Sequence, residues 1–243
     1  MTVSPLVFAL GAAVGNIVGA LAVVRQEKRS LAFIEMCLAF GAGFMLALVL
    51  IGVLPVVFAA QGTPSATAGL LVLLGYVLVH VAQHVITPHF HFGVETHTVG
   101  PEAGYSALVG LTLHAFFDGV AIASGFLVSW SLGVAFFLGV MLHKLPEGVT
   151  VSSIMLASGL GRRRAVASGA VLGIATVIGA LVTEAVAPLA RYGLALAAGV
   201  TLYVAASNLV PEIQRGRRAR TTLAFLGGAV ALIFLRSLAG TGG

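Results

Sequence analysis

The sequence LHAFFDGV at residues 113–120 recurs as LHKLPEGV at residues 142–149, and each copy lies inside a long apolar segment. In each copy a histidine stands four residues before an acid, and a glycine follows the acid. Residues four apart lie on the same face of an α-helix, one turn from each other. If both segments form helices that face each other, the two copies bring two imidazoles and two carboxylates together in an apolar surrounding.

The composition around these copies indicates a membrane protein. Of the 243 residues, 59% are hydrophobic and only 9% are charged, whereas a soluble domain has about 25% charged residues. A membrane-spanning helix needs about 20 mostly apolar residues, and eight such segments occur. We expect an all-α integral membrane protein with a single transmembrane domain over residues 1–243. The expected helices lie at about 3–24, 31–58, 66–87, 104–128, 130–158, 163–187, 190–213 and 220–238.

The basic residues predict the orientation of these helices. Ten of the 13 Lys and Arg residues lie near residues 25–29, 162–164 and 215–220, in the loops after the first, fifth and seventh expected helices. With eight helices these three loops share one side, which the positive-inside rule assigns to the cytoplasm. Both termini are then extracytoplasmic. Because the loops account for the basic charge, we expect no nucleic-acid partner.

Intramembrane acids point to a metal ion. Even low estimates of the free-energy cost of placing an Asp at the centre of a membrane helix are about 2.5–3.5 kcal/mol. We therefore expect Asp118 and Glu147 to have a function. With His114 and His143 they form a set of nitrogen and oxygen donors that suits Zn²⁺, Fe²⁺ or Mn²⁺. The alternative is that each histidine bonds a neighbouring helix and each acid pairs with a base. The repetition of the pair favours the metal site.

Two further features accompany the second copy of the motif. Pro146 removes a backbone hydrogen bond and frees a carbonyl inside its helix. Lys144 directly follows His143, and its ammonium either balances surplus carboxylate charge or acts as a Schiff-base or general-base lysine. We favour charge balance, because nothing in the sequence suggests a carbonyl substrate.

A second internal echo links distant segments. Ala42-Gly43 precedes Pro55 by the same interval that separates Ala198-Gly199 from Pro211. Transporters are often built from inverted repeats with the substrate site near the midplane at their interface. We therefore expect the eight helices in a 3+2+3 arrangement with inverted repeats.

The motifs His-x-x-x-Asp-Gly at 114–119 and His-Lys-Leu-Pro-Glu-Gly at 143–148 resemble the signature helices four and five of the ZIP (Zrt/Irt-like) family of divalent metal transporters, of the prokaryotic type. The resemblance implies a transporter and not an enzyme. It would move a divalent metal, Zn²⁺ first and Fe, Mn or Cd as alternatives, toward the cytoplasm by alternating access. Helices one, four, five and six would shift against the rest. The metal is substrate and no cofactor is expected. A homodimer in the plasma (cytoplasmic or inner) membrane is implied.

The resemblance also implies a ligand set. The transport site would use His114, Asp118, His143 and Glu147, with Met45 from helix two and Glu184 from helix six, the last at a second, adjacent metal position. Two departures affect that second position: Ala115 stands where the family often has Asn, and Lys144 where it often has a polar or acidic ligand. We therefore expect one ion, with the Lys144 ammonium in the space of the second.

A further group of polar residues predicts an exit path to the cytoplasm. His80 and His84 form another i, i+4 pair that leads toward His89 and His91, and Glu212 lies near the cytoplasmic end of helix seven. A short His-rich tract can collect metal ions. The alternatives are hydrogen bonding at a helix end and a flexible polar connector.

Two other classes of function compete with transport. An intramembrane metal-dependent hydrolase would combine metal, water and an acid, but the chain has no His-Glu-x-x-His and duplicates its motif symmetrically. A metal-selective channel remains open as an alternative.

Overall fold

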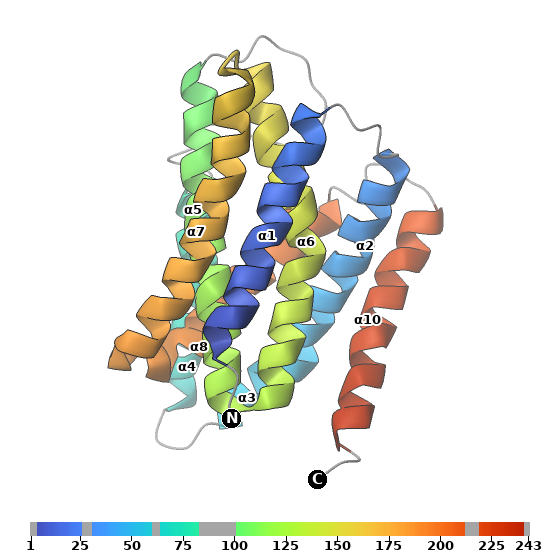
Figure 1. Cartoon of the computed structure of the whole chain (residues 1–243). Helices are drawn as coiled ribbons and strands as arrows, with labels where there is room; N and C mark the ends of the chain where they lie inside the picture. The colour runs from blue at the N-terminus through green and yellow to red at the C-terminus, as the bar shows by residue number, and fades with distance from the viewer. Residues whose placement is uncertain (1–3, 26–30, 60–63, 83–100, 212–218, 241–243) are drawn as a thin grey trace.

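The computed structural model describes residues 4–25, 31–59, 64–82, 101–211 and 219–240, and these residues form helices and no strands. Seven of the described helical spans are long and apolar enough to cross a membrane, and Ser65–Val81 is a shorter apolar helix. The helices run side by side as one bundle (Figure 1). These features make the chain a multi-pass helical membrane protein.

Two of the described connections between helices are short. Ser129 separates α5 from α6 and caps α6 by accepting a hydrogen bond from the Leu132 N–H. Gly159 in the turn before α7 and Gly161, the first residue of α7, both have positive φ. The elements are α1 (Pro5–Val24), α2 (Leu31–Ala47), the π-helix η1 (Leu48–Val53), α3 (Leu54–Ala59), α4 (Ser65–Val81), α5 (Pro101–Val128), α6 (Trp130–Ala157), α7 (Gly161–Ala185), α8 (Ala187–Tyr203), the π-helix η3 (Val204–Leu209) and α10 (Ala219–Gly240).

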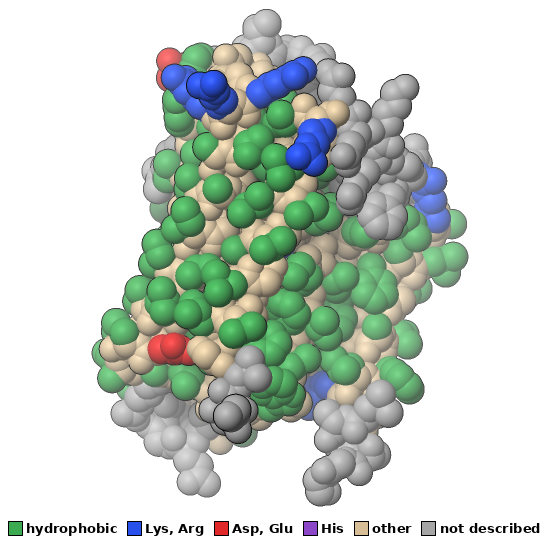
Figure 2. Space-filling model, viewed as in Figure 1, with side chains coloured by type: hydrophobic (Ala, Val, Ile, Leu, Met, Phe, Trp, Pro, Cys, Tyr) green, Lys and Arg blue, Asp and Glu red, His purple; other side chains and the backbone are tan. Residues whose placement is uncertain are grey.

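The outer surface is apolar over most of its height. Figure 2 shows hydrophobic side chains covering the visible face, while Lys and Arg gather mainly at the end where α7 begins. Large apolar side chains such as Leu70, Leu223 and Phe234 are exposed. Apolar side chains suit contact with lipid tails. A helix also meets the second requirement of the bilayer core, because its backbone polar groups are hydrogen-bonded within the helix.

The bundle has a central group of four helices. α5 and α6 contact each other, α1 packs on α6, and α7 packs on α5. At the periphery α2 pairs with α10 and α4 pairs with α8. Figure 1 shows α1 beginning and α10 ending at one end of the bundle, while α7 and α10 begin at the opposite end.

The two π-helices occupy equivalent places in the second sequence echo. Gly43 precedes η1 by the same interval that separates Gly199 from η3. Gly43 lies against a backbone carbonyl of α10 and Gly199 against one of α4. A proline ring clashes with the carbonyl four residues earlier, and for Pro55 and Pro211 that carbonyl falls inside η1 or η3. A wider turn relieves the clash, so both helices widen at the same point.

Candidate metal centre

Asp118 lies between two histidines in the buried middle of the bundle. Its Oδ2 atom is 3.3 Å from Nε2 of His114 on the same helix, and 3.3 Å from Nε2 of His143 on α6. All three side chains are buried. Their ligand atoms lie within 4.8 Å of one another, which is a spacing that a metal ion can bridge. The facing of α5 and α6 thus brings together three of the four residues from the two motif copies.

The orientation of the His143 ring is set by its own helix. Its Nδ1 atom is 3.0 Å from the carbonyl oxygen of Gly139, one turn earlier in α6. A bond from one ring nitrogen to a backbone carbonyl fixes the tautomer and turns the other nitrogen toward the ligand position. The His114 Nδ1 atom is buried without a hydrogen-bond partner among the described residues.

Lys144 is completely buried and lies between the two acids. Its Nζ atom is 2.7 Å from Oδ2 of Asp118 and 2.6 Å from Oε2 of Glu147, and its side chain is 0% exposed. A buried ammonium is tolerated only with such partners, because an unpaired buried charge is very costly. The position agrees with the charge-balance interpretation of this lysine.

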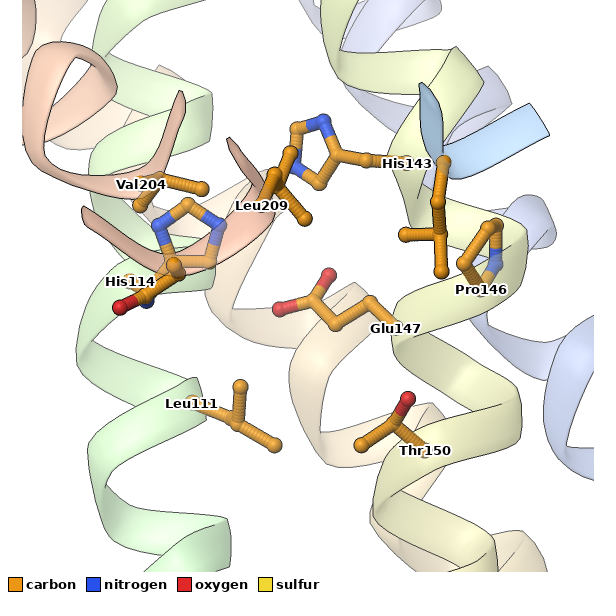
Figure 3. A pocket seen from close by; sticks show the side chains of 10 residues that line it. Leu111, His114, His143, Pro146, Glu147, Thr150, Val204 and Leu209 are labelled. Atoms are coloured by element: carbon orange, nitrogen blue, oxygen red, sulfur yellow. The ribbon is translucent and has the colours of Figure 1, made fainter. Parts of the chain in front are cut away.

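Glu147 uses its two oxygens differently. Oε2 contacts Lys144, whereas Oε1 is buried without a partner among the described residues. Figure 3 shows its carboxylate pointing from α6 into the space in front of His114. That space is a small cavity of about 30 Å³, which Glu147, His114 and His143 line together. This volume holds a water molecule or an ion.

Two further residues that line the cavity lie on one side of the histidines: Leu111 precedes His114 in α5, and Thr150 follows Glu147 in α6. Figure 1 shows α5 beginning and α6 ending at the same end of the bundle. That is the end at which α7 begins with its three consecutive arginines. Asn208 of η3 also lines the cavity, and η3 follows α8, one of the peripheral helices.

Asn16 of α1 is a site residue that we did not predict. With its amide nitrogen turned toward α6, it donates to Oε2 of Glu147 at 3.1 Å and to the carbonyl oxygen of Lys144 at 2.6 Å. The residue is 0% exposed. An isolated Asn in an apolar segment is the signal that points to it, because polar side chains within a membrane helix need a partner.

Met45 lies close to the group without lining the cavity in the part of the chain that the structure describes. It is buried among Ala42, Val204 and Leu209, and its Cγ atom lies beside Gly139, one turn before His143. That Met45 binds the metal stays a prediction.

The structure does not bring Glu184 to the other predicted ligands. Glu184 is exposed and stands one residue before the end of α7. Thr176 is the α7 residue that lies level with Asp118, since Gly119 packs against its carbonyl. Eight residues of helix separate the two, which is about 12 Å along the axis. An acid inside an apolar segment shows its depth only roughly, and here it lies too far along the helix.

The predicted exit path falls mostly on residues that are not described. His80 is exposed on α4, and its ring centroid is 5.8 Å from that of Tyr203. It does not line the cavity. His84, His89, His91 and Glu212 lie outside the described residues, so the exit path stays a prediction.

Comparisons with known proteins identify the family of the chain. The family model described as ZIP zinc transporter matches residues 95–236. The zinc transporter ZIP4 of Homo sapiens is 32% identical over 125 residues, which are 50% of this chain and 19% of that protein. The zinc transporter ZIP9 of Micropogonias undulatus is 28% identical over 169 residues, 62% of this chain and 53% of that protein. ZIP9-A of Xenopus laevis is 28% identical over 166 residues, 61% and 53% respectively.

The chain thus spans about half the length of the ZIP9 relatives and about a fifth of ZIP4. The family match covers more than half of the chain and includes both copies of the motif with all of His114, Asp118, His143 and Glu147. The chain belongs to the ZIP zinc transporter family.

Proposed function

We propose that the protein carries divalent transition metal ions across a membrane toward the cytoplasm by alternating access, Zn²⁺ first, with Fe²⁺, Mn²⁺ and Cd²⁺ as further substrates. The observation that carries this proposal is the convergence of His114, Asp118 and His143, whose ligand atoms lie within 4.8 Å of one another. The Glu147 carboxylate points into the adjoining cavity. Two imidazoles and two carboxylates match the ligand preference of Zn²⁺ and its neighbours.

The direction of the cavity supports an inward-facing conformation. From the histidines it passes Leu111 and Thr150 toward the end of the bundle that carries Arg162–Arg164, which the positive-inside rule places in the cytoplasm. On the other side of the site, Val120, Phe136 and Val140 are buried and packed together. Both termini are then extracytoplasmic, and the plasma membrane is the membrane that we propose.

The packing of the helices supports a 3+2+3 arrangement with inverted repeats. The middle pair is α5 and α6; α1 on α6 then corresponds to α7 on α5, and the α2–α10 pair to the α4–α8 pair. The matched positions of η1 and η3 agree with this symmetry.

The same packing supports a division into two bodies for transport. In the central group of helices, Gly148 lies against the backbone of α1, and Gly119 against the backbone of α7. Such backbone contacts leave little room for sliding within the group. We propose that α1, α5, α6 and α7 shift together against the remaining helices, and that the protein works as a homodimer.

We further propose that each protomer binds a single ion within the membrane. The Lys144 ammonium already occupies the space between Asp118 and Glu147, where a second cation would need both carboxylates. Titration of the purified protein with Zn²⁺ should therefore give one tight intramembrane ion per protomer. Two tight ions would contradict this part of the proposal.

Uptake into liposomes tests the function. Purified protein is reconstituted, and the entry of Zn²⁺, Fe²⁺, Mn²⁺ and Cd²⁺ is followed with a fluorescent indicator. We expect saturable uptake that Glu147→Ala and His143→Ala abolish. Ser153→Ala is the matched control on the same helix, because the Ser153 hydroxyl is exposed and donates to the Val149 carbonyl of its own turn. Uptake that does not saturate would indicate a channel. No uptake of any metal, with hydrolase activity instead, would overturn the proposal.

A further inference from the structure

Asn16 is a polar side chain in the middle of the otherwise apolar helix α1. The segment Pro5–Val24 contains no charged residue, and Asn16 is 0% exposed. A buried amide that lacks hydrogen bonds costs several kcal/mol, on the order of 2–7, when it leaves water. The hydrogen-bond partners of Asn16 therefore show whether its side chain only packs between helices or also contacts the candidate metal centre.

Both hydrogen bonds of the Asn16 amide nitrogen go to α6 at the metal centre. It lies 3.1 Å from Oε2 of Glu147 and 2.6 Å from the carbonyl oxygen of Lys144. These two atoms are acceptors, so the nitrogen donates one hydrogen to each. Next to them, Gly148 lies against the backbone carbonyl of Asn16, and a Cβ on Gly148 would collide with it. The two helices thus touch at this level, and the amide is held in place.

As a consequence, only one of the two oxygens of the Glu147 carboxylate has hydrogen-bond partners among the described residues. Oε2 accepts from Asn16 and from the Lys144 ammonium, at 3.1 Å and 2.6 Å. Oε1 is buried without a partner among the described residues, and the carboxylate points into the cavity beside His114 (Figure 3). An amide that binds one oxygen of a carboxylate orients the other oxygen toward the ion, as the outer partners of metal ligands generally do.

We infer that Asn16 is a positioning residue for ion binding: it holds Oε2 of Glu147 so that Oε1 alone is presented to the ion. This inference rests on the proposed function. It limits Glu147 to one ligand atom, which together with His114, His143 and Asp118 makes four. Four ligands of nitrogen and oxygen form the tetrahedral set that Zn²⁺ takes in proteins, whereas Mn²⁺ favours six. Asn16 thus favours ions that accept four ligands.

Thr176 of α7 provides a matched control inside the same bundle. It is also 0% exposed, and Gly119 lies against its carbonyl as Gly148 lies against that of Asn16. Its hydroxyl, however, donates to the Leu172 carbonyl of its own helix at 3.2 Å and not to Asp118. Thr176→Val therefore changes a buried polar group at the equivalent helix contact without touching an acid.

The experiment compares full-length wild-type protein, Asn16→Leu and Thr176→Val in detergent. Leu is close to Asn in shape but donates no hydrogen bond. The Kd for Zn²⁺ is measured by competition with a coloured chelator, and the visible d–d absorption of bound Co²⁺ reports ligand number and geometry. We expect Asn16→Leu to raise the Kd at least about tenfold, the range found for outer partners of metal ligands, and to change the Co²⁺ spectrum. Thr176→Val should leave both unchanged.

Two outcomes would overturn the inference. One is an Asn16→Leu protein whose Kd stays within twofold of wild type with an unaltered Co²⁺ spectrum. The other is an equal change in Thr176→Val. If Asn16→Leu cannot be purified as a monodisperse protein, Asn16→Ala, which cannot clash, takes its place with the same two readouts. Failure of the wild-type protein to bind Zn²⁺ would instead count against the proposed function.

Discussion

On α5, Gly119 packs against the backbone of Thr176 in α7; on α6, Gly148 packs against the backbone of Asn16 in α1. The two copies of the motif therefore meet their neighbouring helices in the same way. They differ one residue earlier, at the acid. The Asp118 Oδ2 atom is contacted by two imidazoles and an ammonium, at 3.3, 3.3 and 2.7 Å, whereas Glu147 keeps one oxygen without a partner among the described residues.

This difference separates two tasks that one motif performs. Asp118 ties α5 to α6, because its carboxylate joins His114 to His143 and Lys144. Glu147 is fastened through Oε2 and offers Oε1 to the cavity. Under the proposed function, the duplicated sequence thus yields one acid that organises the site and one that is available to an arriving ion.

Removal of the Lys144 ammonium, which contacts the acids of both motif copies, should have the largest effect on stability. Lys144→Met removes the ammonium that contacts both buried carboxylates, and breaking a buried ion pair in this way costs about 3–5 kcal/mol. We expect the metal-free variant to unfold at a markedly lower temperature and to regain stability with Zn²⁺, measured by differential scanning fluorimetry in detergent.

The control for this change is the double variant Lys144→Met with Asp118→Asn, which removes the ammonium and one negative charge together. It should recover part of the lost stability, as coupled neighbours do. If Lys144→Met alone is as stable as wild type without metal, the ammonium does not join the two copies.

Alanine at the two motif glycines tests whether the copies are packed alike. In Gly119→Ala the new Cβ would collide with the Thr176 carbonyl, and in Gly148→Ala with the Asn16 carbonyl. Because backbone atoms cannot move aside easily, we expect each variant to lose about 3 kcal/mol, the upper end of the usual range for overpacking. Unfolding in graded denaturant measures both.

Gly227→Ala on α10 is the matched control, because its Cβ would meet only the Phe40 ring, at 3.9 Å. It should be neutral or stabilising by up to about 1 kcal/mol, since Ala has the higher helix propensity. A clear difference between Gly119→Ala and Gly148→Ala would show that the two helix contacts are not equivalent.

Amide substitutions of the two acids sharpen the difference between them. Both Asp118→Asn and Glu147→Gln should lower Zn²⁺ uptake into liposomes by about a hundredfold or more, since each removes a charged ligand. Their stabilities should diverge. Asp118→Asn disturbs three buried contacts and should cost about 1–3 kcal/mol. Glu147→Gln disturbs two, those of Oε2 with Lys144 and Asn16, and should cost less, near the lower end of about 1 kcal/mol on the same scale. Equal losses of stability would remove the distinction between an organising and an available acid.

An exposed ion pair provides the lower reference for these buried contacts. Arg220 of α10 lies 3.1 Å from Glu35 of α2, and both side chains are more than 40% exposed. Arg220→Ala should change stability by less than about 1 kcal/mol, because water and salt screen such pairs. The difference should shrink further at high salt, measured as a shift in melting temperature. A loss as large as that of Lys144→Met would mean that this pair is shielded from solvent.

Several features of the fold are present in the sequence as local patterns. Each of the eight apolar segments contains a described helix, since hydropathy over about 20 residues is enough to recognise a membrane span. The pairing of His114 with Asp118 also follows from their spacing on one helix. The matched intervals from Gly43 to Pro55 and from Gly199 to Pro211 hinted at related helices. The π-helices η1 and η3 within them were not predicted, because a widened turn has no pattern of its own.

For the candidate metal centre, too, some residues could be recognised from sequence patterns, whereas others depend on how distant helices pack. Glu184 illustrates the limit: the family resemblance suggested it as a ligand at a second metal position, but its place near the end of α7 takes it away from Asp118. Asn16 illustrates the converse, since no motif marks it, although its amide bonds the Glu147 carboxylate.

Hydropathy and the i, i+4 spacing are properties of neighbouring residues, so the sequence was sufficient to predict the helices and the two motif copies. The orientation that loop charge indicates stays a prediction. The packing of α1, α5 and α6 against one another decides which carboxylate oxygen of Asp118 or Glu147 has a partner. Distances between atoms on different helices arise from that packing alone. The contact of Asn16 with Glu147 and the insertion of Lys144 between the two acids are therefore visible only once the helices are assembled.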